Sequence, residues 1–184
     1  MSKIRLKKIL AMTLLTALVG STFLGCGSTE NTVSSGNVEQ KIVYNIDANP
    51  KTIDPQLNSA VDGSKVIRNT FEGLMREIEN GEVENGIAEG YEVSEDGLVY
   101  TFHIRDNAKW SDGEDVTAKD FEYAWKRALN PNTAAEYAYQ LFYIKNGEAY
   151  NKGEASADDV GIKVVDNKTI EVTLESAVPY FVSL

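Results

Sequence analysis

The sequence predicts a mixed α/β (α+β) fold from three observations. Some short segments alternate apolar and polar residues, as a half-buried strand does, while others carry apolar residues at helical spacing. Pairs that contain Gly, Asn or Pro separate these segments and mark turns. No segment recurs at a fixed period, which excludes a repeat architecture. Of the 184 residues, 42% are hydrophobic, which is enough to bury a core.

The amino terminus is typical of an export signal. Four basic residues and no acid lie in the first eight positions, and residues 9–25 then form an uncharged run of 17 residues. This run is short for a membrane-spanning helix and suits the apolar region of a signal peptide. We therefore expect residues 1–25 to be a signal peptide that the mature protein lacks.

The only cysteine, Cys26, directly follows this run. Residues 23–26 (FLGC) resemble the lipobox of bacterial lipoproteins, in which the cysteine thiol becomes diacylated. We therefore predict that Cys26 carries lipid and holds the protein at a membrane surface; the alternative is a buried free cysteine. Residues 26–40 are rich in Asn, Ser and Gly and predict a flexible tether to the folded segment, residues 41–184.

Charge excludes nucleic acid as a partner. Lys and Arg total 18 against 28 Asp and Glu, and four of the basic residues lie in the signal. The remaining 159 residues (184 − 25) therefore carry 14 basic and 28 acidic groups, a net charge of −14. Such a chain repels a polyanion. One Cys and one His also exclude a disulfide framework and a Cys/His metal site.

The first elements of the folded segment are a strand and a helix. Residues 41–46 alternate apolar and polar side chains and predict a strand. From a possible cap at Asp62, apolar residues at helical spacing predict a helix with Gly73 near its exit and its apolar face in the core. This face comprises Val66, Ile67, Thr70, Phe71 and Leu74.

A hairpin and a capped helix follow. Residues 90–93 and 98–104 are extended runs around residues 94–97, whose Gly97 can take the positive φ of a tight turn. After a turn at residues 112–113, residues 117–120 (TAKD) resemble a capping box and predict a helix that ends at residues 130–131. Its core face carries Phe121, Trp125, Ala128 and Leu129.

The last predicted elements are a helix and a second hairpin. A capping box at residues 133–136 predicts a helix that stops at residues 146–147. Residues 161–165 and 169–174 alternate around residues 166–167 as a hairpin does. Residues 178–184 begin an apolar element without a cap or polar tail, and we interpret the sequence as a truncated chain.

No residue pattern supports catalysis. Nucleophile-elbow, phosphate-loop, dinucleotide-binding and zinc-protease motifs are missing from the sequence, and His103 lies in an alternating run where it is expected to occupy a sheet face. Most of the aromatic residues between positions 110 and 143 are expected in the core. Tyr137 and Tyr139, two apart on the predicted helix, cannot both face that core, so at least one is available to a ligand. These aromatic residues are Trp110, Tyr123, Trp125, Tyr137, Tyr139, Phe142 and Tyr143.

Several motifs in order carry a resemblance to a known family. Residues 100–113 (YTFHIRDNAKWSDG) and the following residues 116–121 and 125–127 resemble the signature of the peptide/nickel group of extracellular solute-binding proteins, family 5. The resemblance runs from about Ile42 to Leu184 and is greatest to the oligopeptide-binding lipoproteins of ABC importers. Further motifs in register are Asp54-Pro55, residues 71–74 (FEGL), 130–134 (NPNTA) and 178–181 (VPYF).

The resemblance implies a two-lobed, periplasmic-binding-protein-like fold (type II, cluster C). This sequence corresponds to the amino-terminal part of lobe I, so the rest of that lobe and all of lobe II are expected to be missing. By motif register, Ser59, Ala60 and Val61 are expected to lend backbone groups to the ligand. The same register places Tyr137 opposite the main chain of a bound peptide.

The expected function is to capture oligopeptides by their backbone and deliver them to an ABC transporter permease. The resemblance implies neither catalysis nor a cofactor or metal, and the protein is expected to be a monomer. It is expected to be exported and lipid-anchored to the outer face of the bacterial cell membrane, on the periplasmic side if an outer membrane exists. Alternatives are another cargo, namely a dipeptide, a peptide pheromone, nickel or haem, or an exported hydrolase.

Overall fold

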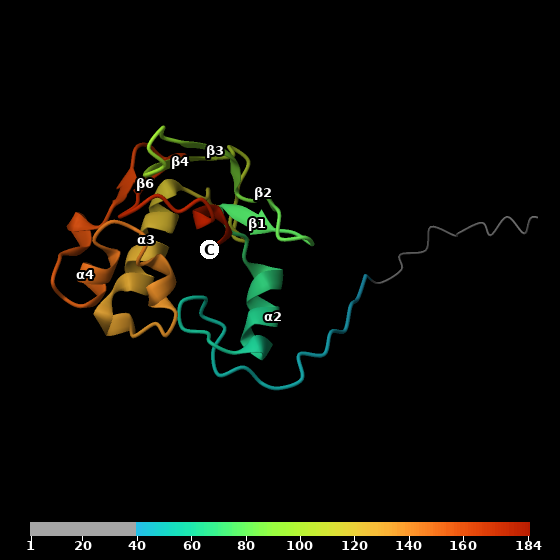
Figure 1. Ribbon diagram of the computed structural model, residues 1–184. Helices are drawn as coiled ribbons and strands as arrows, with labels where there is room; N and C mark the ends of the chain where they lie inside the picture. Colours follow the sequence, from blue (N-terminus) through green and yellow to red (C-terminus); the bar gives the residue numbers. More distant parts are fainter. Residues whose placement is uncertain (1–39) are drawn as a thin grey trace, which may run out of the picture. The chain divides into compact units, whose positions relative to one another are not determined.

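The computed structural model describes residues 40–184 (Figure 1). The predicted signal peptide, Cys26 and nearly all of the predicted tether lie outside the described residues. The chain divides into two compact units, residues 1–43 and 44–184, and the second holds every helix and strand described here. None of these helices has the length and apolar content needed to cross a lipid bilayer.

The centre of the second unit is a four-stranded antiparallel sheet in the order β3-β4-β6-β5. Strands β3 (Ala88–Val93) and β4 (Val99–Ile104) form one hairpin, and β5 (Ile162–Val164) and β6 (Thr169–Thr173) form the other. Pairing of β4 with β6 joins the two hairpins. Both hairpins were predicted, and Gly97 has the expected positive φ of 71°.

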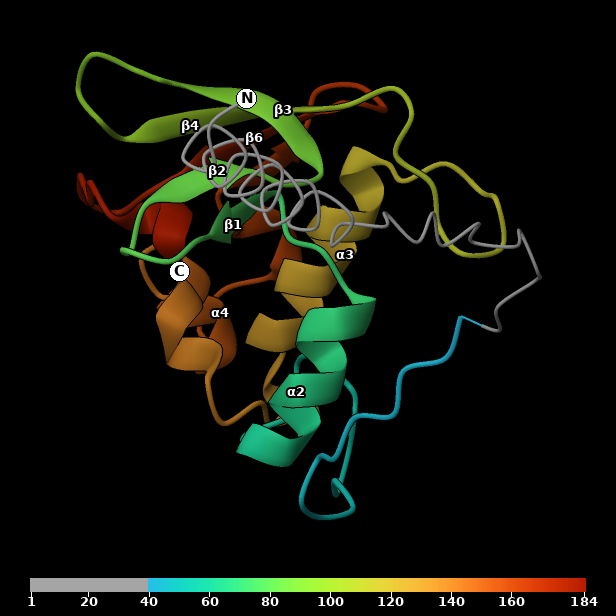
Figure 2. The same cartoon turned by 90° about the vertical axis from the view of Figure 1, so that its right-hand side faces the viewer.

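One face of this sheet forms the core with helix α3 (Ala118–Leu129), and the helices lie on this side of the sheet in both views (Figure 1, Figure 2). Alternate residues of β4, from Tyr100 to Ile104, are buried, as the period of a strand requires. The capping box of α3 is confirmed, because the Asp120 carboxylate accepts hydrogen bonds from Thr117 N (2.7 Å) and Oγ1 (2.9 Å). Leu129 is fully buried.

Helix α2 (Val61–Thr70) begins two residues earlier than predicted, because Ala60 and not Asp62 occupies the N-cap position. Its apolar face is only partly in the core. Leu74 is buried but lies beyond the end of α2, Val66 and Ile67 are half-buried, and Thr70 and Phe71 (48% exposed) are at the surface, so the core prediction is wrong for Thr70 and Phe71.

A hairpin of β1 (Met75–Glu77) and β2 (Val83–Asn85) follows α2 and was not predicted. The sequence does carry a signal for it. Asn80 and Gly81 both have positive φ, 98° and 73°, and Asn-Gly is the pair that tight hairpin turns prefer.

The helix predicted from residue 133 is wrong. The chain instead forms two 3₁₀ helices, Pro131–Thr133 and Ala138–Leu141, followed by α4 (Gly147–Asn151). Ala134 lies in the left-handed region with φ 52° and ψ 41°, which interrupts a right-handed helix at the predicted first turn. Residues 146–147 begin α4, although the sequence predicted that a helix ends there.

The strand predicted at residues 41–46 is also absent. An isolated strand has no ladder of hydrogen bonds, and no strand in the described part of the chain pairs with these residues. Four of the seven aromatic residues expected mostly in the core are exposed. They are Trp110, Tyr123, Tyr137 and Tyr139, with exposed fractions of 43%, 68%, 47% and 55%.

Candidate ligand-binding pocket

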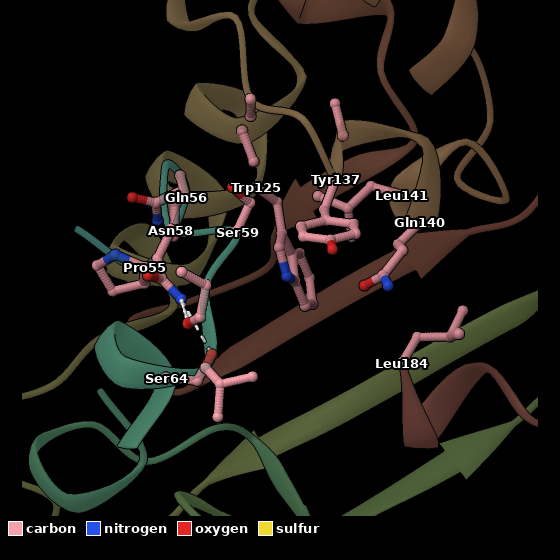
Figure 3. A pocket seen from close by; sticks show the side chains of 16 residues that line it. Pro55, Gln56, Asn58, Ser59, Ser64, Trp125, Tyr137, Gln140, Leu141 and Leu184 are labelled. Atoms are coloured by element: carbon pink, nitrogen blue, oxygen red, sulfur yellow. Dashed lines mark hydrogen bonds between the residues drawn. The ribbon is translucent and has the colours of Figure 1, made fainter. Parts of the chain in front are cut away.

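The loop before α2, helix α3 and the segment around the second 3₁₀ helix surround a pocket of about 650 Å³ (Figure 3). The structure brings all four predicted ligand residues to this one pocket. Ser59, Ala60 and Val61 lie on one side, and Tyr137 comes from the 3₁₀ segment. The pocket therefore unites residues that are far apart in the sequence.

The backbone of residues 59–60 is open to a ligand. Ala60 is extended, with φ −121° and ψ 150°. Its carbonyl accepts hydrogen bonds from Ser64 N (3.0 Å) and Asn58 Nδ2 (2.9 Å). The N–H groups of Ser59 and Ala60 and the carbonyl of Ser59 have no hydrogen-bond partner within residues 40–184. An extended segment with unpaired backbone groups is able to pair with another extended chain.

Asn58 and Gly63 fix the shape of this loop. Asn58 Nδ2 also donates to Ser64 Oγ (3.0 Å), which ties the loop to the first turns of α2. Gly63 is buried beneath the Asn58 side chain. A Cβ atom at Gly63 would lie 2.0 Å from Asn58 Oδ1 and 2.8 Å from the Thr52 carbonyl oxygen, so only glycine allows this approach.

A charged contact joins the loop to α3. The Arg127 guanidinium donates to both oxygens of Asp54, Nη1 to Oδ1 at 2.8 Å and Nη2 to Oδ2 at 2.5 Å, and Nη1 also donates to Gln56 Oε1. This hydrogen-bonded guanidinium lowers the pKa of Asp54, and the carboxylate in turn raises the pKa of Arg127. Both groups therefore remain ionised across the neutral range.

Aromatic rings form another part of the pocket wall. Trp125 of α3 is half-buried and packs against Phe121, with ring centroids 6.4 Å apart. Tyr137 is 47% exposed, and its ring centroid lies 5.9 Å from that of Tyr139. Figure 3 shows Trp125 between the loop residues and Tyr137. The prediction that at least one of the two tyrosines is exposed is confirmed, because both are.

Sequence reasoning missed several residues of the pocket. Trp125 was assigned to the core because it lies on the apolar face of a helix, and Asn58 and Gln140 carried no motif. The described lining contains aromatic, aliphatic, amide and hydroxyl groups and no charged side chain. Together with the open backbone of Ser59 and Ala60, it can hold a neutral, extended chain by hydrogen bonds and apolar contact.

Known proteins are similar to this chain in sequence and in fold. A family model for bacterial extracellular solute-binding proteins, family 5 (middle), matches residues 82–184. The oligopeptide-binding protein OppA of Bacillus subtilis is 49% identical over 163 residues, which cover 88% of this chain and 30% of that protein.

Two solved structures superpose on this chain. The substrate-binding domain of an oligopeptide ABC transporter from Bacillus anthracis gives a TM-score of 0.67 at 50% identity, over 69% of this chain and 24% of that one. OppA of Haemophilus influenzae in complex with the peptide RPPGFSPFR gives a TM-score of 0.72 at 37% identity, over 76% of this chain and 28% of that one. The chain therefore spans less than a third of the length of these proteins.

Proposed function

Because this chain belongs to the bacterial extracellular solute-binding proteins of family 5, we propose that it is part of the oligopeptide-binding component of an ABC importer. In this proposal, residues 41–184 are the amino-terminal part of lobe I of a two-lobed clamp. Ser59, Ala60, Val61 and Tyr137 contact the main chain of the peptide. Lobe II closes over the ligand, and the closed protein delivers it to the permease.

The observation that carries this proposal is the open, extended backbone of Ser59 and Ala60 beside Trp125 and Tyr137 in one pocket. Every peptide offers the same N–H and C=O groups, so pairing through the main chain gives affinity without selecting a sequence. Aromatic faces and amide groups add contacts that tolerate many neutral side chains. The similar Haemophilus influenzae protein, whose structure is a complex with a peptide, supports a peptide as the cargo.

The test is to purify the full-length protein and identify its cargo by mass spectrometry after incubation with a peptide mixture. Recovery of intact peptides of several sequences supports the proposal, whereas cleaved products favour an exported hydrolase. Calorimetry with alanine peptides of two to six residues separates a dipeptide carrier from an oligopeptide carrier. Replacing an amide of the peptide by an ester removes one N–H donor and is expected to lower the affinity about tenfold if the backbone is paired.

Proteins of this family act outside the cytoplasm, which fits an export signal. We propose further that Cys26 carries lipid and anchors a monomeric protein to the outer face of the cell membrane. Cys26→Ser is expected to release the protein into the soluble fraction on cell fractionation. Continued membrane attachment of this variant would show that the uncleaved apolar segment, and not lipid, holds the protein.

In this proposal the protein binds its cargo without a cofactor or metal and does not change it chemically. Nickel or haem as the cargo requires a metal or porphyrin in the purified protein, which elemental analysis and absorption spectroscopy detect. A peptide pheromone as the cargo predicts a single peptide sequence in the mass spectrum instead of many. These outcomes separate the alternatives from general oligopeptide uptake.

A further inference from the structure

The loop that carries Ser59–Val61 has few attachments to the rest of the second unit. Its large apolar residues point outward, since Ile53 is 54% and Leu57 is 39% exposed. The side-chain amide of Asn58 donates only to Ala60 and to Ser64 of α2. Among residues 44–60, polar contacts to an element other than α2 come only from Asp54 and Gln56 in the described structure, and both go to Arg127.

We call Asp54, Gln56 and Arg127 the clasp. Asp54 is also the centre of the turn that leads to the pocket. Its carboxylate accepts a hydrogen bond from Gln56 N (3.1 Å), and its carbonyl accepts from Leu57 N (3.1 Å) and Asn58 N (3.0 Å). The two parallel bonds from the guanidinium fix the orientation of the carboxylate as well as its distance. The orientation of this turn is therefore set by α3.

The same helix forms part of the pocket wall. Arg127 lies on α3 two residues after Trp125, and Ala124 and Ala128 of α3 also line the pocket. Asn58 follows Asp54 by four residues and bonds to the carbonyl of Ala60. Rigid links therefore run from α3 through the clasp and Asn58 to the open backbone groups at Ser59 and Ala60.

We propose that Arg127 is a positioning residue for peptide capture: through Asp54 and Gln56 it holds the backbone of Ser59–Val61 at the spacing from α3 that an extended peptide requires. The inference rests on the proposed function. Asp54 and Arg127 side chains are each 28% exposed, and ion pairs of such exposure contribute little to folding stability. Loss of the clasp therefore affects binding more than thermal stability.

The test compares Arg127→Gln with Lys126→Gln in the full-length protein. Lys126 is the matched control, because it is the neighbouring residue of α3 and loses the same charge and an ion pair with Glu122 (2.8 Å). Calorimetry with tetra-alanine is expected to show at least tenfold weaker binding for Arg127→Gln and a change within about twofold for Lys126→Gln. Thermal unfolding of both variants is expected to remain close to that of the wild type.

Hydrogen–deuterium exchange of the peptide-free protein measures positioning directly. The amides of residues 56–58 are hydrogen-bonded to Asp54, so Arg127→Gln is expected to speed their exchange and leave exchange within α3 unchanged. Asp54→Asn and the double variant Asp54→Asn/Arg127→Gln complete a double-mutant cycle of peptide affinity. The double variant is expected to bind peptide no more weakly than either single variant, because both substitutions remove the same contact between Asp54 and Arg127.

The inference would be overturned if Arg127→Gln bound tetra-alanine and exchanged its amides as the wild type does. It would also be overturned if the losses of binding free energy in the two single variants added up in the double variant. Failure of the wild-type protein to bind tetra-alanine would count against the proposed function instead. In that case, faster exchange at residues 56–58 in Arg127→Gln would still support the clasp.

Discussion

Gly63→Ala tests the packing that shapes the pocket loop. The added Cβ would lie 2.0 Å from Asn58 Oδ1, where an ordinary contact is at least 3.4 Å, so the amide must move by about 1.4 Å. That movement breaks the bonds of Asn58 to Ala60 and Ser64, each worth about 0.5–1.5 kcal/mol. Overpacking against the Thr52 carbonyl adds about 1–3 kcal/mol.

The higher helix propensity of alanine offsets about 1 kcal/mol of this cost. The net result is a loss of about 1–5 kcal/mol in the free energy of unfolding, centred near 3 kcal/mol, or about 1–2 M in the urea midpoint. Urea unfolding followed by tryptophan fluorescence measures it, and Gly90→Ala is the control, because nothing lies within 4 Å of a Cβ there. A midpoint for Gly63→Ala equal to or above that of Gly90→Ala would refute the reasoning.

Two further predictions concern the ligand and pH. In the full-length protein, Tyr137→Ala is expected to lower peptide affinity about tenfold in calorimetry. Tyr139 lies outside the pocket lining, so Tyr139→Ala is expected to change the affinity less than about twofold. A lowered thermal transition with unchanged affinity in Tyr137→Ala would mean that Tyr137 contributes to folding stability and not to binding. Arg127 holds the pKa of Asp54 below its ordinary value of 3.8, so the stabilisation from this pair is complete above that value and is lost as the pH falls through the lower, folded-state pKa. The urea midpoint of the wild type should therefore exceed that of Asp54→Asn by a small, constant amount from about pH 5 to 7 and converge with it in stronger acid. A gap that widens on acidification would contradict this assignment.

Local signals account for the parts of the fold that the sequence predicted correctly. Gly97 supplies a positive φ in the first hairpin turn, and Thr117 with Asp120 begins α3 by contacts within four residues. These preferences do not depend on distant parts of the chain. The hairpins and α3 were therefore predictable before the sheet order was known.

The missed β1–β2 hairpin has a local signal at Asn80-Gly81. The other failures arise where a local pattern competes with other constraints. Residues 133–136 have the composition of a capping box, but Ala134 adopts a left-handed conformation and the chain turns toward the pocket as a 3₁₀ helix. The alternation at residues 41–46 cannot reveal whether a partner strand is present. Pattern reasoning also cannot recognise Trp125 as a pocket residue, because a helix face that borders a pocket has the same spacing as one that is fully buried.

The candidate site was predicted in part. Motif register brought Ser59, Ala60, Val61 and Tyr137 together, and the structure places all four at one pocket, while their contact with peptide stays a prediction. Arg127 was noted only as part of a family motif. Its partner Asp54 is 73 positions away, and no periodicity or spacing rule reports a pair at that separation.

The neutral lining of the pocket, in a chain with a net charge of −10, has a consequence for conditions outside the cell. Mobile ions weaken attraction between charges, but they have little effect on bonds between uncharged amides or on contact with aromatic rings. The share of affinity that this wall contributes should therefore be the same in fresh water and in brine. In the proposed function, this part of the pocket would therefore bind a peptide with the same strength when the salinity outside the cell changes.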